Sequence, residues 1–154
     1  MTSGGSDEEC PAPGISRQAD ASRKVRILVV DDSVDAADSM CAVLRLFGND
    51  AAMAHDGESA IAIVAEYQPD LVFMDLSLPT LSGLEAGKQI RDAVAPNSVV
   101  VVAMTGWGRD EDRAASLQYG FDGHLTKPVD FQQLKGIIRD VAVARGISST
   151  QRLS

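Results

Sequence analysis

The chain has 154 residues, 45% of them hydrophobic and 23% charged, which is typical of one soluble globular domain and not of a disordered or fibrous chain. Its formal net charge is -8, from 14 Lys and Arg against 22 Asp and Glu, and this disfavours binding to nucleic acids or anionic membrane surfaces. No apolar run approaches the about 20 residues of a membrane span, and residues 1–24 lack the apolar stretch of a secretory signal, so we expect a cytoplasmic protein.

Residues 1–24 mix Gly, Ser, Pro and both charges, and beyond Met1 they include one large apolar side chain, Ile15. Such a segment buries too little apolar surface to order itself, so we expect a disordered N-terminal tail. Cys10 lies in this tail, and Cys41 lies in a helical pattern further along. Two unrelated thiols are typical of a reducing compartment and not of a disulfide framework or a metal site.

The first strand is predicted in the run VRILVVD, which begins at Val25 and is too short and too uniformly apolar for an amphipathic helix. We expect this strand to be buried on both faces. Ser33 can cap the helix that follows, and Gly48 ends it. Its apolar residues recur at steps of three and four positions, at Val34, Ala37, Cys41, Leu44 and Phe47.

The same alternation continues to the end of the chain. Further strand patterns are DAAMAH, LVFMD, SVVVVAMT and FDGHLT. Helical patterns run from Asp56-Gly57 to Pro69, from Leu84 to Val94 after a loop holding Pro79 and Gly83, from Glu111 to Tyr119, and from Phe131 to Arg145. The final helix carries Phe131, Leu134, Ile138 and Val141 on one side. We expect residues 147–154 to be a C-terminal tail, too short for another domain.

Five strand patterns alternating with five helical ones predict an α/β fold, with a parallel sheet, helices on both faces and right-handed crossovers. We expect this domain to span residues 25–146. In such sheets, ligands bind beyond the carboxyl ends of the strands.

Polar residues occupy those strand ends: Asp31 and Asp32 after the first strand, Asp75 at the third, Thr105 at the fourth and Lys127 after the fifth. Crowded carboxylates repel one another unless a cation lies among them, and oxygen ligands without His or Cys suit Mg²⁺ or Mn²⁺. An ammonium and a hydroxyl are suitable partners for the free oxygens of a phosphoryl group. The strand ends therefore predict a site for a divalent ion together with a phosphoryl group.

Four motifs in order resemble the receiver domain of two-component response regulators: VDDS at Val30 to Ser33, FMDLSLPTLSG around Asp75, AMTGWG around Thr105 and HLTKPVD around Lys127. The resemblance covers about Val25 to Gly146. It implies a flavodoxin-like sheet of order 2-1-3-4-5, and a single-domain response regulator that acts in signalling and not as an enzyme.

By this resemblance, Asp75 is the phosphoacceptor, a carboxylate nucleophile that takes a phosphoryl group from a phosphohistidine and later loses it to water. The implied Mg²⁺ ligands are Asp31, acting largely through water, Asp32, Asp75 and the backbone carbonyl of Ser77. Lys127 would pair with a phosphoryl oxygen, and Thr105 would move to bond another.

The implied partners are a sensor histidine kinase or a histidine phosphotransfer protein, and a downstream protein target that the sequence does not identify. Pro128, directly after the lysine, resembles the family's cis-peptide position.

Two positions depart from the familiar pattern. Many members carry a rotating Tyr or Phe three residues before the lysine, where this chain has His124. His124 either acts as a switch that depends on pH or is a partly exposed strand residue without a signalling role. Trp107 either borders the route of the hydrolytic water or packs on the surface. His55 is interpreted as a turn residue and not as a phosphodonor or ligand.

Two other functions compete with the receiver interpretation. A Mg²⁺-dependent phosphohydrolase with an aspartyl nucleophile generally has a second acid two positions after the first, where this chain has Ser33 after Asp31. A nucleotide-binding or flavin-binding module needs a phosphate-binding loop after the first strand, where Asp31 and Asp32 would repel the phosphate.

Overall fold

The structure of the protein is a computed structural model that describes residues 24–78, 82–94, 98–106 and 110–147. Apart from Lys24 and Ile147, both predicted tails lie outside these residues, and so do Cys10 and Trp107, so the expectations for them stay predictions. Within the described part of the chain, no helix has the length and apolar character needed to cross a membrane.

The core of the fold is a five-stranded sheet in which every neighbouring pair of strands is parallel. Its strands are β2 (Arg26–Val30), β3 (Asp50–Ala54), β4 (Leu71–Asp75), β5 (Val100–Thr105) and β6 (Gly123–Thr126). They lie in the order β3-β2-β4-β5-β6, which is 2-1-3-4-5 counted along the chain. The predicted α/β fold and strand order are therefore confirmed.

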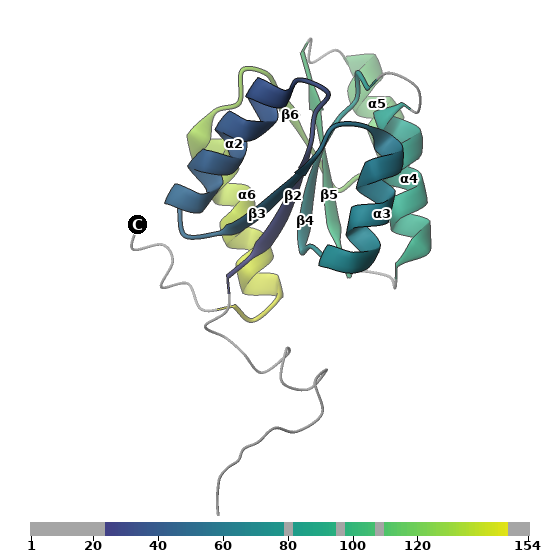
Figure 1. The fold of residues 1–154 in the computed structure, drawn as a ribbon. Helices are drawn as coiled ribbons and strands as arrows, with labels where there is room; N and C mark the ends of the chain where they lie inside the picture. The colour runs from purple at the N-terminus through teal and green to yellow at the C-terminus, as the bar shows by residue number, and fades with distance from the viewer. Residues whose placement is uncertain (1–23, 79–81, 95–97, 107–109, 148–154) are drawn as a thin grey trace, which may run out of the picture.

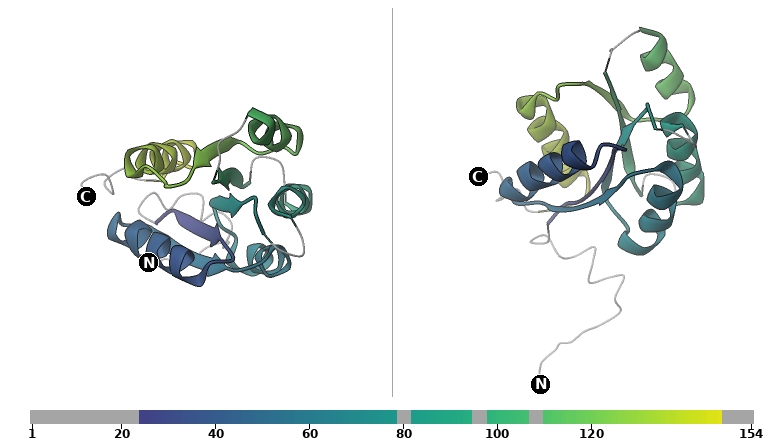
Figure 2. Two further views of the ribbon diagram at one scale, coloured as in Figure 1. Left: turned by 90° about the horizontal axis from the view of Figure 1, so that it is seen from above. Right: turned by 45° about the horizontal axis from the view of Figure 1, so that its top comes forward.

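Helices cover both faces of this sheet (Figure 1). They are α2 (Val34–Leu46), α3 (Gly57–Tyr67), α4 (Gly83–Ala93), α5 (Asp110–Gln118) and α6 (Phe131–Ala144). Seen from above in Figure 2, α2 and α6 lie on one side of the sheet, and α3, α4 and α5 lie on the other. Each helix begins near the carboxyl end of the strand before it, so the helix starts surround one edge of the sheet.

Side-chain caps fix where the helices begin. The Ser33 hydroxyl accepts a hydrogen bond from the amide of Ala36 at 3.2 Å and starts α2, as predicted. Ser82 caps α4 by accepting from the amide of Glu85 at 3.2 Å. The prediction that Gly83 belongs to a loop is wrong, since α4 begins at Gly83. The sequence Ser-Gly-Leu-Glu has the spacing of a capping box and contained the signal for this start.

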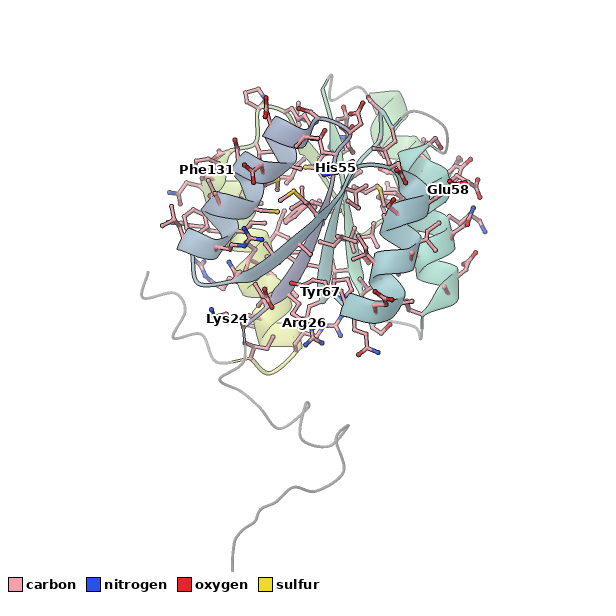
Figure 3. All side chains as sticks on the ribbon, viewed as in Figure 1. Lys24, Arg26, His55, Glu58, Tyr67 and Phe131 are labelled. Atoms are coloured by element: carbon pink, nitrogen blue, oxygen red, sulfur yellow. The ribbon has the colours of Figure 1, made fainter. Side chains whose placement is uncertain are left out.

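The predicted burial of the first strand is confirmed, because the side chains of Ile27 to Val30 in β2 are completely buried between the two helical layers. Val34 and Phe131 belong to the apolar repeats predicted for α2 and α6, but they are 58% and 51% exposed and do not enter the core. Each is the first residue of a helix at the edge of the sheet, where the strand no longer covers it. Phe131 instead makes an edge-to-face contact with the ring of Phe47, at 6.3 Å between centroids (Figure 3 labels Phe131).

Gly87 of α4 lies directly against the ring of Phe121, and an added Cβ would overlap that ring. We expect Gly87→Ala to lower the free energy of unfolding by about 1–3 kcal/mol, because the buried ring must shift to make room. Gly136 of α6 is a matched control, since a Cβ there meets nothing within 4 Å. Gly136→Ala should stabilise the protein by about 0.5–1 kcal/mol through helix propensity. Both free energies of unfolding are measured by urea denaturation. If the two variants changed this free energy in the same direction, the prediction would be contradicted.

Candidate functional site

Three carboxylates meet at the carboxyl edge of the sheet. Asp31 and Asp32 follow β2, Asp75 ends β4, and the two strands are parallel neighbours with Val30 beside Met74. One oxygen from each acid lies within 4.8 Å of the others. Asp31 and Asp75 are only 3% and 4% exposed, whereas Asp32 is exposed. The fold thus brings the adjacent acids Asp31 and Asp32, one buried and one exposed, together with the buried Asp75 of a different strand.

Lys127 reaches this cluster from the end of β6. Its Nζ donates to Oδ2 of Asp31 at 2.9 Å and to Oδ2 of Asp75 at 3.0 Å. Its backbone amide donates to the carbonyl of Thr105 at 2.7 Å, which ties the lysine to the end of β5. The peptide between Lys127 and Pro128 is cis, as the resemblance implies. One ammonium therefore serves both buried acids.

Backbone amides hold the other oxygen of each buried acid. Asp31 Oδ1 accepts from the amide of Ser33 at 3.0 Å, and Asp75 Oδ1 accepts from the amide of Ser77 at 2.8 Å. Both donors lie two residues after the acid that they bind. The two carboxylates are therefore oriented by the turns that leave their own strands, and each presents Oδ2 to Lys127. Ser77 is placed beside Asp75, and the role of its carbonyl stays a prediction.

Burial, together with the neighbouring charge of Asp31, raises the pKa of Asp75 more than the hydrogen bonds from Ser77 and Lys127 and the charge of Lys127 lower it. Burial also lowers the pKa of Lys127, but the hydrogen bonds and charges of Asp31 and Asp75 outweigh that effect and leave the pKa raised. The Lys127 ammonium is therefore charged at neutral pH, whereas the buried environment of Asp75 disfavours the charged form of its carboxylate.

This environment predicts that Asp75→Asn stabilises the protein without metal. Because the pKa of Asp75 is raised in the fold, the folded state binds its proton more tightly than the unfolded state does. The cost of the charge is absent well below the ordinary value of 3.8 and is complete once the pH exceeds the raised pKa. With chelator present, we expect the variant to melt a few degrees higher than the parent at pH 7, and the difference to shrink towards pH 4. A variant that melts lower at pH 7 would contradict the prediction.

Thr105 is the last residue of β5, the strand that pairs with the Asp75 strand β4, and it is 3% exposed. It pairs with Thr126 at the edge where the acids lie. His124 is half-buried in β6, opposite Ala103. The structure therefore places Thr105 at the predicted edge, and the choice between the two interpretations of His124 stays open.

Gly83 allows α4 to start directly against the site. A Cβ on Gly83 would clash with the backbone carbonyl oxygen of Asp75 and the Cα of Leu76. Any side chain there must push α4 away from the end of β4, the strand that carries Asp75. The sequence contained the signal for the start of α4 but not this contact, which depends on where α4 packs against the end of β4.

Residues 27–139 match the family model of the response regulator receiver domain. The chain belongs to this family, and the predicted class of protein is confirmed. PhoB of Escherichia coli strain K12, named as the phosphate regulon transcriptional regulatory protein, is 36% identical over 123 residues, which cover 80% of this chain and 53% of that protein. The chain thus spans about half the length of this relative.

Two solved receiver domains are similar in both sequence and structure. The receiver domain of Saccharomyces cerevisiae Ssk1, solved with the histidine phosphotransfer signalling protein Ypd1, is 30% identical with a TM-score of 0.74, covering 86% of this chain and 98% of that one. The receiver domain of the Pseudomonas aeruginosa sensor histidine kinase PA1611, solved with a magnesium ion coordinated in its active-site cleft, is 29% identical with a TM-score of 0.69, covering 78% and 98%.

Proposed function

We propose that the chain is a phosphoacceptor of a two-component phosphorelay, in which Asp75 takes a phosphoryl group from a phosphohistidine in a Mg²⁺-dependent reaction. The observation that carries the proposal is the cluster of Asp31, Asp32 and Asp75, in which the ammonium of Lys127 pairs with both Asp31 and Asp75. The protein acts as a signalling switch and not as an enzyme that turns over small substrates.

The cluster suits a hard divalent cation, because its three residues offer only carboxylate oxygens. Asp31, Asp32, Asp75 and the carbonyl of Ser77 would hold Mg²⁺. When bound, the ion would neutralise charge on the phosphoryl oxygens. The related PA1611 receiver domain, solved with magnesium in its cleft, supports this assignment.

Three side chains and one backbone amide have separate roles in the transfer of the phosphoryl group. The carboxylate of Asp75 forms a bond to phosphorus as the bond from phosphorus to the histidine nitrogen breaks. The Lys127 ammonium, which lies 3.0 Å from Asp75 Oδ2, pairs with a phosphoryl oxygen, and the nearby Thr105 hydroxyl bonds another. The amide of Ser77 keeps the carboxylate oriented throughout.

The phosphodonor partner is a sensor histidine kinase or a histidine phosphotransfer protein. The solved complex of the Ssk1 receiver domain with a histidine phosphotransfer protein supports this class of partner. The downstream target is a protein whose binding changes when Asp75 is phosphorylated.

Incubation with acetyl phosphate, followed by intact-mass analysis, tests the proposal. The chain should gain one phosphoryl group with Mg²⁺ and none with excess chelator. Sustained hydrolysis of p-nitrophenyl phosphate would instead favour the phosphohydrolase. An equal mass gain with and without chelator would contradict the role of Mg²⁺.

A further inference from the structure

His55, the residue after β3, contacts the backbone of the acidic cluster. Its Nδ1 lies 3.1 Å from the backbone carbonyl oxygen of Asp31, and its side chain is half-buried. Figure 3 labels it at the edge of the sheet where the helices begin. A carbonyl oxygen can only accept a hydrogen bond, so Nδ1 must carry the proton whether the imidazole is neutral or charged. His55 is therefore more than a turn residue, because it donates to the chain that carries two of the three acids.

This bond extends the pairing of β2 and β3 beyond their last residues. The amide of Asp31 donates to the carbonyl of Ala54 at 3.0 Å. After Ala54 the chain turns into α3, where Asp56 serves as the N-cap by accepting from the amide of Ser59. The His55 side chain supplies a bond to the carbonyl of Asp31 at the point where the backbone ladder of β3 ends.

The hydrogen bond from His55 also affects Asp32, because the peptide bond between Asp31 and Asp32 is planar. The carbonyl of Asp31 and the amide nitrogen of Asp32 belong to one rigid plane, so fixing the carbonyl fixes the plane from which Asp32 projects. The carboxylate of Asp31 is separately held by Ser33 and Lys127. Asp32 is the exposed acid of the cluster, and its position depends most on the backbone that carries it.

We propose that His55 is a positioning residue that orients the peptide between Asp31 and Asp32 and so places the Asp32 carboxylate for the divalent ion. The role toward the ion rests on the proposed function. The orientation itself is a property of the metal-free chain, so the two can be tested separately.

The test compares His55→Ala with His55→Asn. Asparagine can place an N–H on the atom bonded to Cγ, as the imidazole does at Nδ1, and so can keep the hydrogen bond. Ser59→Ala is the matched control, because it removes the side-chain hydrogen bond of Ser59 to Asp56 at the start of α3 and leaves the contact of His55 with Asp31 in place. All variants are measured in the same buffer at the same pH. Thermal melts confirm that each variant is folded.

In the metal-free protein, ¹H–¹⁵N NMR should show a protonated Nδ1 in the parent. The backbone amide signals of Asp32 and Ser33 should shift in His55→Ala and stay close to the parent's in His55→Asn and Ser59→Ala. In calorimetric titrations with Mg²⁺, His55→Ala should bind about threefold to tenfold more weakly, the range expected for loss of one hydrogen bond. The other two variants should bind within about twofold of the parent, since they keep that bond.

Unchanged Asp32 signals in His55→Ala would overturn the inference, and so would equal effects of His55→Ala and His55→Asn. Unchanged Mg²⁺ affinity in His55→Ala, with a parent that binds, would overturn the role toward the ion. If the parent itself bound no Mg²⁺, the proposed function would fail, and the metal-free NMR measurements would still decide whether His55 orients Asp32.

Discussion

Asp75→Asn should take up no measurable phosphoryl group from acetyl phosphate with Mg²⁺, a loss of several orders of magnitude in rate. The amide has almost the same shape as the carboxylate and can still accept from the amide of Ser77, so the fold is kept. It lacks the negative charge and the nucleophilic oxygen that attack on phosphorus requires. The loss of phosphorylation would therefore result from the missing nucleophile and not from unfolding, since the variant should melt at a higher temperature than the parent.

Asp92→Asn is the control for this experiment. Asp92 lies on the exposed side of α4 and pairs with Lys88 at 2.9 Å, so the change removes the same charge away from the cluster. Intact-mass analysis should find that this variant is phosphorylated as fast as the parent. Phosphorylation of Asp75→Asn at the parent's rate, or its loss in Asp92→Asn, would contradict the assignment of Asp75.

Asp32→Ala and Lys127→Ala should change Mg²⁺ affinity in different directions. Asp32→Ala removes a ligand, and the expected loss is at least the about 10-fold to 100-fold that removing a ligand's supporting partner costs in metal sites. Lys127→Ala removes an ammonium that binds oxygens of Asp31 and Asp75, so the affinity should stay the same or rise. We expect Lys127→Ala to uncouple phosphorylation from the conformational change.

Calorimetric titration with Mg²⁺ measures both changes, and Lys88→Ala serves as the control. Lys88 is an exposed lysine of α4 that pairs with Asp92, so its removal should leave the affinity unchanged. If Asp32→Ala and Lys127→Ala were equally impaired, the separate roles of ligand and phosphoryl partner would be wrong.

The sequence by itself determined the elements and the edge at which the polar residues lie. The apolar run of β2, the Ser33 cap and the alternation of strand and helix patterns depend on local periodicity and capping, which neighbouring residues specify. Parallel strands place all their carboxyl ends at one edge. Asp31, Asp75 and Thr105 were therefore expected to lie at that edge before any contact was known.

Only the tertiary structure decided which atoms meet there. The bonds of the Lys127 ammonium to Asp31 and Asp75 join residues 96 and 52 positions apart, and that of His55 to Asp31 joins residues 24 apart. Periodicity shows which face a side chain takes, but contact depends on how the crossovers pack the elements together. For the same reason, the close approach of Gly83 to Asp75 became visible only in the folded chain.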